Sequence, residues 1–234
     1  MPSAPSRPPF GSRSRPASHA TGDSTRARLI DAATEVFIEE GFKAARVQAI
    51  AEQAGVRLSA INYHFGSKAG LYLAVLQHHA EAALAHAPLL PEDPAAPLRE
   101  RFEFFVKGML TRLLDPHSHS RIAWLAVREL TSPTAALDEM FGSFVLPQAQ
   151  IGLALIAEIL GPRAAPIDCL RAMASVAGQA LAYRVAQPLI ERLQPGLYDS
   201  PELVGQLTRH IAEFSWAGLQ AQAARLPQQQ GTQA

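Results

Sequence analysis

Residues 57–68 bring together side chains that could contact a nucleic acid. Asn62, Tyr63 and His64 follow one another in a short polar and aromatic helix, and such a helix offers its side chains to the major groove of DNA. Gly55 stands between two short stretches with helical spacing, where a glycine supplies the tight turn of a helix-turn-helix. These residues predict DNA binding through the second helix. Two helices that merely pack together are the alternative.

A second group of charged residues lies inside an apolar stretch further along the chain. Trp124 and Arg128 stand one helical turn apart, and Glu129 follows. Charges in such a setting must be paired or line a cavity, where a polar group would orient a small amphipathic ligand. The alternative is an ion pair that joins helices, or side chains that reach solvent. Further pocket candidates, each of which fits a plain core equally well, are Phe105, Met109, Gln179 and Tyr183.

The histidines offer the best support for a rival class, an enzyme or ligand carrier built on a helical bundle. They include the pair His78 and His79, and a second pair, His117 and His119. A catalytic bundle site commonly uses Glu-x-x-His pairs on facing helices, and the sequence contains no such pair. Cys169 is the single cysteine, so no cysteine-based metal spacing exists. We therefore expect no enzyme activity, no metal and no cofactor.

Composition indicates a folded protein of balanced charge. Of the 234 residues, 48% are apolar and 18% charged, with 21 basic and 21 acidic side chains, which permits a sizeable core. The first 80 residues hold nine Lys or Arg against six acids, and the rest hold twelve against fifteen. The basic side therefore lies at the DNA end. Wholly apolar runs are short and the N-terminus lacks a signal-like apolar stretch, so we expect a cytoplasmic protein without a membrane span.

Apolar residues recur at spacings of three and four from Thr25 onward, which predicts an all-α fold. We expect helices over 24–40, 47–54, 58–65, 68–87, 98–114, 120–131, 133–160, 166–193 and 201–225. Gly41 should end the first helix, Ser67 should cap the fourth and Pro188 should interrupt the eighth. Four prolines within 88–97 predict a break between helices.

The chain divides into four expected regions. Residues 1–24 hold five prolines, six serines and one acid, a composition typical of a disordered tail. Its three arginines could touch a polyanion, although a solvated leader is the simpler interpretation. Residues 25–72 form the expected helix-turn-helix domain and 73–226 a ligand-binding and dimerisation domain. Residues 227–234 form a flexible tail.

Residues 25–76 resemble the DNA-binding region of the tetracycline-repressor-type (TetR) regulators of bacteria. The resemblance rests on a series of matching segments: LIDAA at 29–33, GF at 41–42, VQAIA at 47–51, AGV at 54–56 and INYHFGSKAGLY at 61–72. It implies a ligand-responsive transcriptional regulator that acts as a homodimer. One departure is Asn62, where many members carry tyrosine.

The resemblance also implies roles for individual residues. Lys68 corresponds to the family's phosphate-contacting lysine, at the positive end of a helix. Backbone or base contacts are implied for Arg46, Gln48, Tyr63 and His64. Ser59, Ala60 and Asn62 would meet base edges, with Asn62 suited to adenine and the Ala60 methyl to thymine. Arg57 would reach a phosphate, or remain a solvated charge.

The segment WLAVRELTSPTAALD at 124–138, with Tyr183 and Arg184 further on, resembles the CerR/CecR-type C-terminal domain of one branch of these regulators. That resemblance implies a small-molecule effector and control of neighbouring efflux or transport genes, most often by repression. It implies a dimer through the last two long helices, which are rich in small residues and carry Phe214, Trp216 and Leu219. Such a dimer matches a palindromic operator. A third class, an architectural DNA binder without an inducer, would show weak sequence preference.

Overall fold

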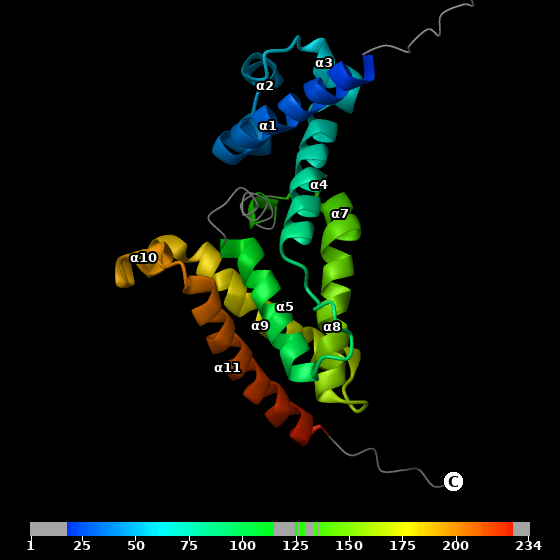
Figure 1. Cartoon of the computed structure of the whole chain (residues 1–234). Helices are drawn as coiled ribbons and strands as arrows, with labels where there is room; N and C mark the ends of the chain where they lie inside the picture. Colours follow the sequence, from blue (N-terminus) through cyan, green and yellow to red (C-terminus); the bar gives the residue numbers. More distant parts are fainter. Residues whose placement is uncertain (1–17, 115–124, 126, 130–132, 135, 227–234) are drawn as a thin grey trace, which may run out of the picture.

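The computed structural model describes residues 18–114, 125, 127–129, 133–134 and 136–226. The all-α prediction is confirmed, since the described residues form helices and connecting segments and include no strand. Figure 1 shows a small head of α1, α2 and α3 at one end, joined by the long α4 to a larger helical body. The elements are α1 Ser18–Ala44, α2 Val47–Gln53, α3 Ser59–Phe65, α4 Lys68–His86, α5 Leu98–Leu114, α7 Ala136–Met140, η2 Phe141–Val145, α8 Leu146–Leu160, α9 Pro166–Val185, α10 Gln187–Leu193, η3 Leu197–Asp199 and α11 Leu203–Arg225.

The first helix begins earlier than the sequence predicts. Helix α1 starts at Ser18 rather than near Ser24, so residues 18–24 are helical and do not belong to an irregular tail. The reason is that no proline follows Pro16 in this stretch, so backbone hydrogen bonds can propagate toward the N-terminus. At the other end, the predicted interruption at Gly41 is confirmed. Its φ of 79° and ψ of 167° are non-helical and essentially reserved for glycine.

Helix α4 connects the head to the body. The predicted cap at Ser67 is confirmed, because its hydroxyl oxygen accepts a hydrogen bond of 3.0 Å from the backbone N–H of Gly70. Its buried face packs against α1 in one core that also takes in Leu125 and Met140 from the body. The proline-rich segment 88–97 is non-helical and separates α4 from α5, as predicted. The head core therefore extends along α4 to Leu125 and Met140, and it is separate from the main core of the body.

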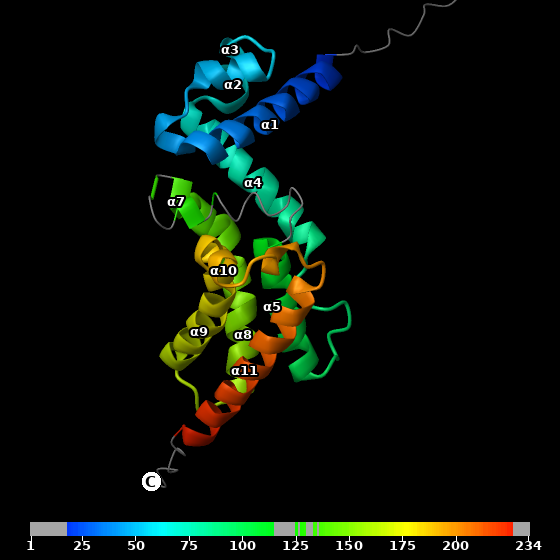
Figure 2. The ribbon, with the colours of Figure 1, turned by 90° about the vertical axis from the view of Figure 1, so that its left-hand side faces the viewer.

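The body is a bundle of α5, α8, α9 and α11. Its main core contains Phe102, Val106, Ile156, Val176 and Ile211, which these four helices contribute. Figure 2 shows the four helices, with α11 ending beside the C-terminus label. The helical run Asp138–Leu160 is long and apolar enough to cross a membrane by length and composition, a test that core helices of soluble proteins also pass. Here α8 packs against α5, α9 and α11.

Two boundaries in the body differ from the predicted helices. The helix expected over 133–160 begins at Ala136 in the described residues, since Pro133 and Thr134 are non-helical; the backbone N–H of Thr134 donates a 3.0 Å hydrogen bond to Oε2 of Glu129. A π-helical turn, η2, then interrupts it before α8. The helix expected over 120–131 lies mostly outside the described residues. The predicted break near Pro188 is confirmed, since α9 ends at Val185 and α10 starts at Gln187.

Candidate nucleic-acid interface

The head contains a helix-turn-helix whose turn depends on one glycine. Gly55 has a φ of 61°, a left-handed conformation that glycine adopts without strain. The N–H groups of Gly55 and Val56 donate to the carbonyls of Glu52 and Ala51, both at 3.0 Å. Ile50 of α2 and Ile61 of α3 are buried against α1. Packing of these apolar faces fixes the direction in which the opposite face of α3 points.

That opposite face of α3 carries most of the side chains that the sequence predicts to meet DNA. Tyr63 is 84% exposed, and Ser59 and Asn62 are also exposed. His64 is half-buried, with its ring centroid 4.9 Å from that of Tyr63 in an edge-to-face pair. Ala60 is half-buried and packs against the head core, so only part of it can meet a ligand. The helix offers a largely polar surface with one prominent phenol.

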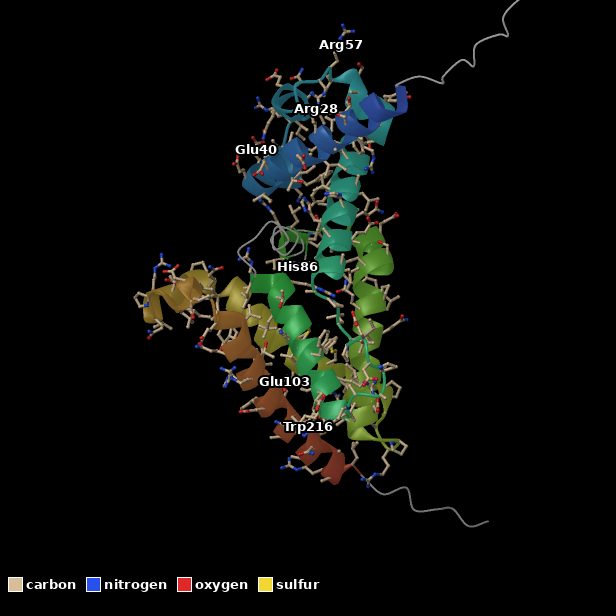
Figure 3. The ribbon with its side chains drawn as sticks, in the orientation of Figure 1. Arg28, Glu40, Arg57, His86, Glu103 and Trp216 are labelled. Atoms are coloured by element: carbon tan, nitrogen blue, oxygen red, sulfur yellow. The ribbon has the colours of Figure 1, made fainter. Side chains whose placement is uncertain are left out.

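Three further predicted contacts lie around this helix. Arg46 is the exposed residue that precedes α2, and Gln48 is exposed in its first turn. Arg57 is exposed in the turn before α3 and projects from the end of the head furthest from the body (Figure 3). The structure therefore brings Arg46, Gln48 and Arg57 to the same small domain as α3, as a helix-turn-helix requires.

Lys68 starts α4 and points back toward α1. Its ammonium lies 4.9 Å from the centroid of the Phe42 ring and donates a 3.2 Å hydrogen bond to the carbonyl of Lys43. The side chain is half-buried. The cation–π contact with Phe42 holds the Lys68 ammonium in one position. The N-terminal end of α4 adds the positive potential of the helix dipole at the same place. The arrangement suits a fixed anchor better than a flexible reader.

Buried contacts tie this anchor to the body. The ring of Tyr72 on α4 packs 5.0 Å from the ring of Phe42, and its hydroxyl donates a 2.8 Å hydrogen bond to Glu129. Glu129 is 1% exposed and also accepts from the hydroxyl and N–H of Thr134. Burial and the bond to Glu129 raise the pKa of the Tyr72 hydroxyl well above its ordinary value. Tyr72 therefore remains a neutral donor.

Arg128 reaches the head from the other side of the same segment. Its guanidinium donates to the carbonyls of Ile38 and Glu40, at 3.0 and 3.3 Å, where α1 loses its regular hydrogen bonding before Gly41. A Cβ on Gly41 would lie 2.5 Å from that guanidinium. Arg128 thus joins helices, and together with Glu129 it also lines a small pocket of about 160 Å³ beside Gly41, so both expected arrangements occur at this position. We call Tyr72, Arg128, Glu129 and Thr134 the junction.

The remaining pocket candidates fall into different places. Met109 lines an apolar cleft of about 410 Å³ between α4, α5, η2, α8 and α9, which we call the arginine cleft after Arg112. Gln179 and Tyr183 line a second cleft of about 480 Å³ between α9 and α11. Phe105 is 1% exposed in a small core cluster with Leu89 and Leu155. Trp124 lies outside the described residues.

The arginine cleft contains two polar residues that sequence analysis missed, Arg112 and Gln148. Arg112 is 8% exposed, and its Nε donates a 2.8 Å hydrogen bond to the carbonyl of Ala87. It also donates to the side-chain oxygen of Gln148. The sequence signal for Arg112 is an arginine within the largely apolar stretch VKGMLTRLL of α5. Arg128 was selected for the same reason, a charge among apolar residues.

The histidine pair that favoured a bundle enzyme has a structural role. The ring of His79 on α4 hydrogen-bonds to the hydroxyl of Thr34 on α1 at 2.8 Å, and His78 is exposed beside it. His117 and His119 lie outside the described residues. Within the described part of the chain, no group of three or more His, Cys, Asp or Glu side chains could hold a metal ion.

Two families of known proteins match this chain. Residues 29–75 match the family described as bacterial regulatory proteins, tetR family. Residues 98–219 match the C-terminal domain of the HTH-type transcriptional dual regulator CecR. CecR of Shigella flexneri is 30% identical over 187 residues, which are 75% of this chain and 82% of CecR. Together the two family matches cover most of the head, the first turns of α4 and most of the body.

Other relatives match different lengths of the chain. FasR of Mycolicibacterium smegmatis, a transcriptional activator, is 48% identical over 59 residues, but these are only 25% of this chain and 27% of FasR. RutR of Escherichia coli K12 is 28% identical over 160 residues, 68% of this chain and 70% of RutR. A transcriptional regulator from Rhodococcus sp. Rha1 has a similar solved structure, with a TM-score of 0.60 at 22% identity, over 86% of this chain and 99% of that one. The last match concerns the fold alone.

Proposed function

We propose, from the premise that this chain belongs to the tetR family of DNA-binding transcriptional regulators, with a CecR-type C-terminal domain, that it is a cytoplasmic repressor released from DNA by a small molecule. The family consists of regulators and not of enzymes, which removes the bundle-enzyme alternative. The observation that carries the proposal is the exposed polar face of α3. This face belongs to a head that the junction connects to a body, and the body contains clefts. Repression, the inducer and the dimer belong to the proposal.

DNA recognition would divide between anchoring and reading. Lys68 and Arg46 would hold phosphates, because Lys68 follows the recognition helix, Arg46 precedes α2 and both are positively charged. Ser59, Asn62 and Tyr63 would meet bases or backbone in the major groove, where the exposed face of α3 fits. Gln48, Arg57 and His64 would add contacts at the edges, and the half-buried Ala60 would offer its methyl to a thymine.

A homodimer would form through α9 and α11. These helices are held side by side by a 3.0 Å hydrogen bond from Nε2 of Gln179 to Oγ of Ser215. Small residues permit close helix approach, and Phe214 is 68% exposed on the same face. A two-fold dimer would place two recognition helices on a palindromic operator. The exposed residues of this face are Ser175, Gly178, Ala182, His210, Phe214, Gly218 and Ala221.

Release from DNA would use the two connections between body and head, namely α4 and the junction. A ligand can shift an equilibrium only by binding one conformation more tightly than the other. A body that changes shape around a ligand would move Arg128 and Glu129 relative to α1 and α4. The genes controlled would be neighbouring efflux or transport genes, which the resemblance to the CecR branch favours.

The experiment that tests the proposal is a binding titration against the DNA that flanks the gene, at two salt concentrations and with scrambled competitor. We expect binding near or below about 10 nM that survives competitor. Tyr63→Ala should weaken it by about tenfold or more without changing the thermal midpoint. Phe141→Ala is the matched control, since Phe141 is a half-exposed aromatic in η2, outside the helix-turn-helix. Absence of specific binding, or equal effects of both substitutions, would contradict the proposal.

The dimer has its own test. Gly218 on α11 has open space where a side chain would go, so Gly218→Arg should leave one protomer folded but obstruct a partner. Gly142 in η2 has equally open surroundings, and Gly142→Arg is the control. Sedimentation velocity should show a dimer for the wild type and the control, and monomer for Gly218→Arg. A dimer in all three would move the interface elsewhere.

A further inference from the structure

We propose that the arginine cleft binds an organic anion with an apolar body, whose carboxylate or similar group pairs with Arg112. The inference rests on the proposed function and names the chemical class of its effector. It follows from a buried cation at the wall of an apolar cleft. The cleft encloses about 410 Å³, within the range of roughly 300–1,000 Å³ for small-molecule sites.

The walls of the cleft determine the body of the ligand. Apart from Arg112 and Gln148, every lining side chain is apolar, and one glycine completes the wall. Four helices and the π-helical turn contribute them, so the cleft is built by long-range packing. A ligand that fills it must bring apolar surface and gains by removing that surface from water. The lining residues are Ala83, Met109, Arg112, Leu113, Phe144, Gln148, Ala174, Ala177, Gly178 and Leu181.

Arg112 determines the charge of the ligand. A guanidinium offers five N–H donors. Its Nε and one Nη both donate to the carbonyl of Ala87, and the other Nη donates to Oε1 of Gln148. These acceptors are neutral, and within the described part of the chain no carboxylate lies within ion-pair distance of Arg112. Two N–H donors, one on each Nη, therefore remain for a further acceptor, and a carboxylate oxygen accepts such charge-assisted hydrogen bonds.

Burial of the charged Arg112 guanidinium is unfavourable in free energy when no anion pairs with it. It lowers the pKa of Arg112 to about 10, and no neighbouring charge contributes to that shift. Arginine still carries its charge at neutral pH, so the cleft holds a desolvated positive charge at rest. A bound anion would offset that cost, whereas a cationic ligand would add to it and a neutral ligand would leave it unchanged.

Gln148 is held so that its oxygen faces Arg112. Its Nε2 donates a 2.8 Å hydrogen bond to the carbonyl of Phe144, in the π-helical turn η2. Single π-helical turns within α-helices occur frequently at functional sites. Gln148→Glu changes the volume little and would place an internal carboxylate beside Arg112; the variant loses the hydrogen bond to the Phe144 carbonyl, and attraction to the guanidinium orients the carboxylate instead. The substitution would supply the charge that the ligand supplies in our proposal.

The test is calorimetric titration of the full chain, without DNA, with 2-naphthoate and with its neutral counterpart 2-naphthamide. We expect the naphthoate to bind at least about tenfold more tightly than the amide, because only the naphthoate forms a charge-assisted pair. Gln148→Glu should weaken naphthoate binding by about tenfold and leave amide binding within about twofold. Gln150→Glu is the matched control, since Gln150 is exposed on the same helix and outside the cleft.

A second substitution locates the apolar body. Ala177→Phe fills the cleft without changing charge and should abolish binding of both probes. Equal binding of naphthoate and amide, equal effects of the two glutamate substitutions, or no naphthoate binding would each overturn the proposal. The DNA titration described above is done on the same preparations without a probe. A chain that binds DNA specifically but not naphthoate refutes the cleft assignment alone, and the reverse result refutes the DNA-binding function alone.

Discussion

Two buried charges in this molecule have opposite surroundings. Glu129 at the junction accepts hydrogen bonds from Tyr72 and Thr134, donors that belong to the protein itself. Arg112 in the arginine cleft meets only neutral acceptors. The first charge is satisfied when the chain folds, and its partners come from α4 and from the segment that follows Glu129. The second retains hydrogen-bonding capacity beside an apolar space. Burial of a charge therefore has two uses here, to join two domains and to attract a ligand.

The strongest test of that contrast is Glu129→Ala. Removal of the carboxylate leaves the Tyr72 hydroxyl and the Thr134 N–H without an acceptor in a buried place, so we expect a loss of about 3 kcal/mol in the free energy of unfolding. Urea titration followed by circular dichroism measures it. Glu139→Ala, at an exposed position on α7, should change stability by less than about 0.5 kcal/mol. Similar losses for both would show that Glu129 is not a structural partner.

The pH dependence of stability tests the donor side of the junction. The pKa of Tyr72 is raised in the folded chain, so above pH 10 the unfolded chain loses a proton that the folded chain keeps. Stability should therefore fall as pH rises, by about 1.4 kcal/mol per pH unit from this group. Tyr72→Phe should remove that part of the slope between pH 10 and 11, whereas Tyr63→Phe, at an exposed site, should not. Identical slopes for the wild type and Tyr72→Phe would refute the role of Tyr72.

Arg112→Met tests how much the buried charge of the arginine cleft contributes to stability, for comparison with Glu129→Ala. The substitution removes the cost of a buried cation but leaves the Ala87 carbonyl and the Gln148 side chain without their donor, so we expect about 1–2 kcal/mol of destabilisation. Urea titration should show a smaller loss than for Glu129→Ala. A loss as large as that of Glu129→Ala would mean that Arg112 is structural, and the two buried charges would then be alike.

The smallest effect on stability is expected for Arg128→Ala, because Arg128 is exposed. Its two hydrogen bonds end on backbone carbonyls at the break in α1, so the substitution should weaken the response of DNA binding to ligand by about fivefold. Arg163 is a matched control, since it is also exposed and donates to the carbonyls of Leu226 and Ala223 at the far end of the body. DNA-binding curves with and without 2-naphthoate compare the two variants. An unchanged ligand response in Arg128→Ala would remove the junction from the release mechanism.

The sequence was sufficient to predict the local structure of the head but not the residues that line the clefts. The turn at Gly55, the cap at Ser67 and the break at Gly41 depend on local chemistry, which a single sequence displays. The predicted start of α1 was wrong because Ser24 can cap a helix but need not do so. The sequence then gives no sharp signal for the residue at which the helix begins. Pro133 was placed in a helix because a proline after a serine is typical of a helix start, whereas the helix in fact begins at Ala136.

The clefts depend on which helices meet, which helical periodicity does not specify. Met109, Gln179 and Tyr183 do line clefts, but they belong to two different ones. Arg128 was selected for its charge among apolar neighbours, and it both binds the head and lines a small pocket at the junction. Arg112 has the same local pattern and faces a cleft. The two arginines are distinguished only by packing between elements far apart in sequence.

Helix α4 can also be regarded as a rigid rod held at both ends. Lys68 at one end contacts the carbonyl of Lys43 on α1, and Ala87 at the other accepts from Arg112. A helix of 19 residues is about 28 Å long, so a tilt of about 5° about one end moves the other by about 2.5 Å. That displacement is close to the length of a hydrogen bond. A movement too small to disturb the packing of the body is thus large enough to take Lys68 out of reach of a phosphate.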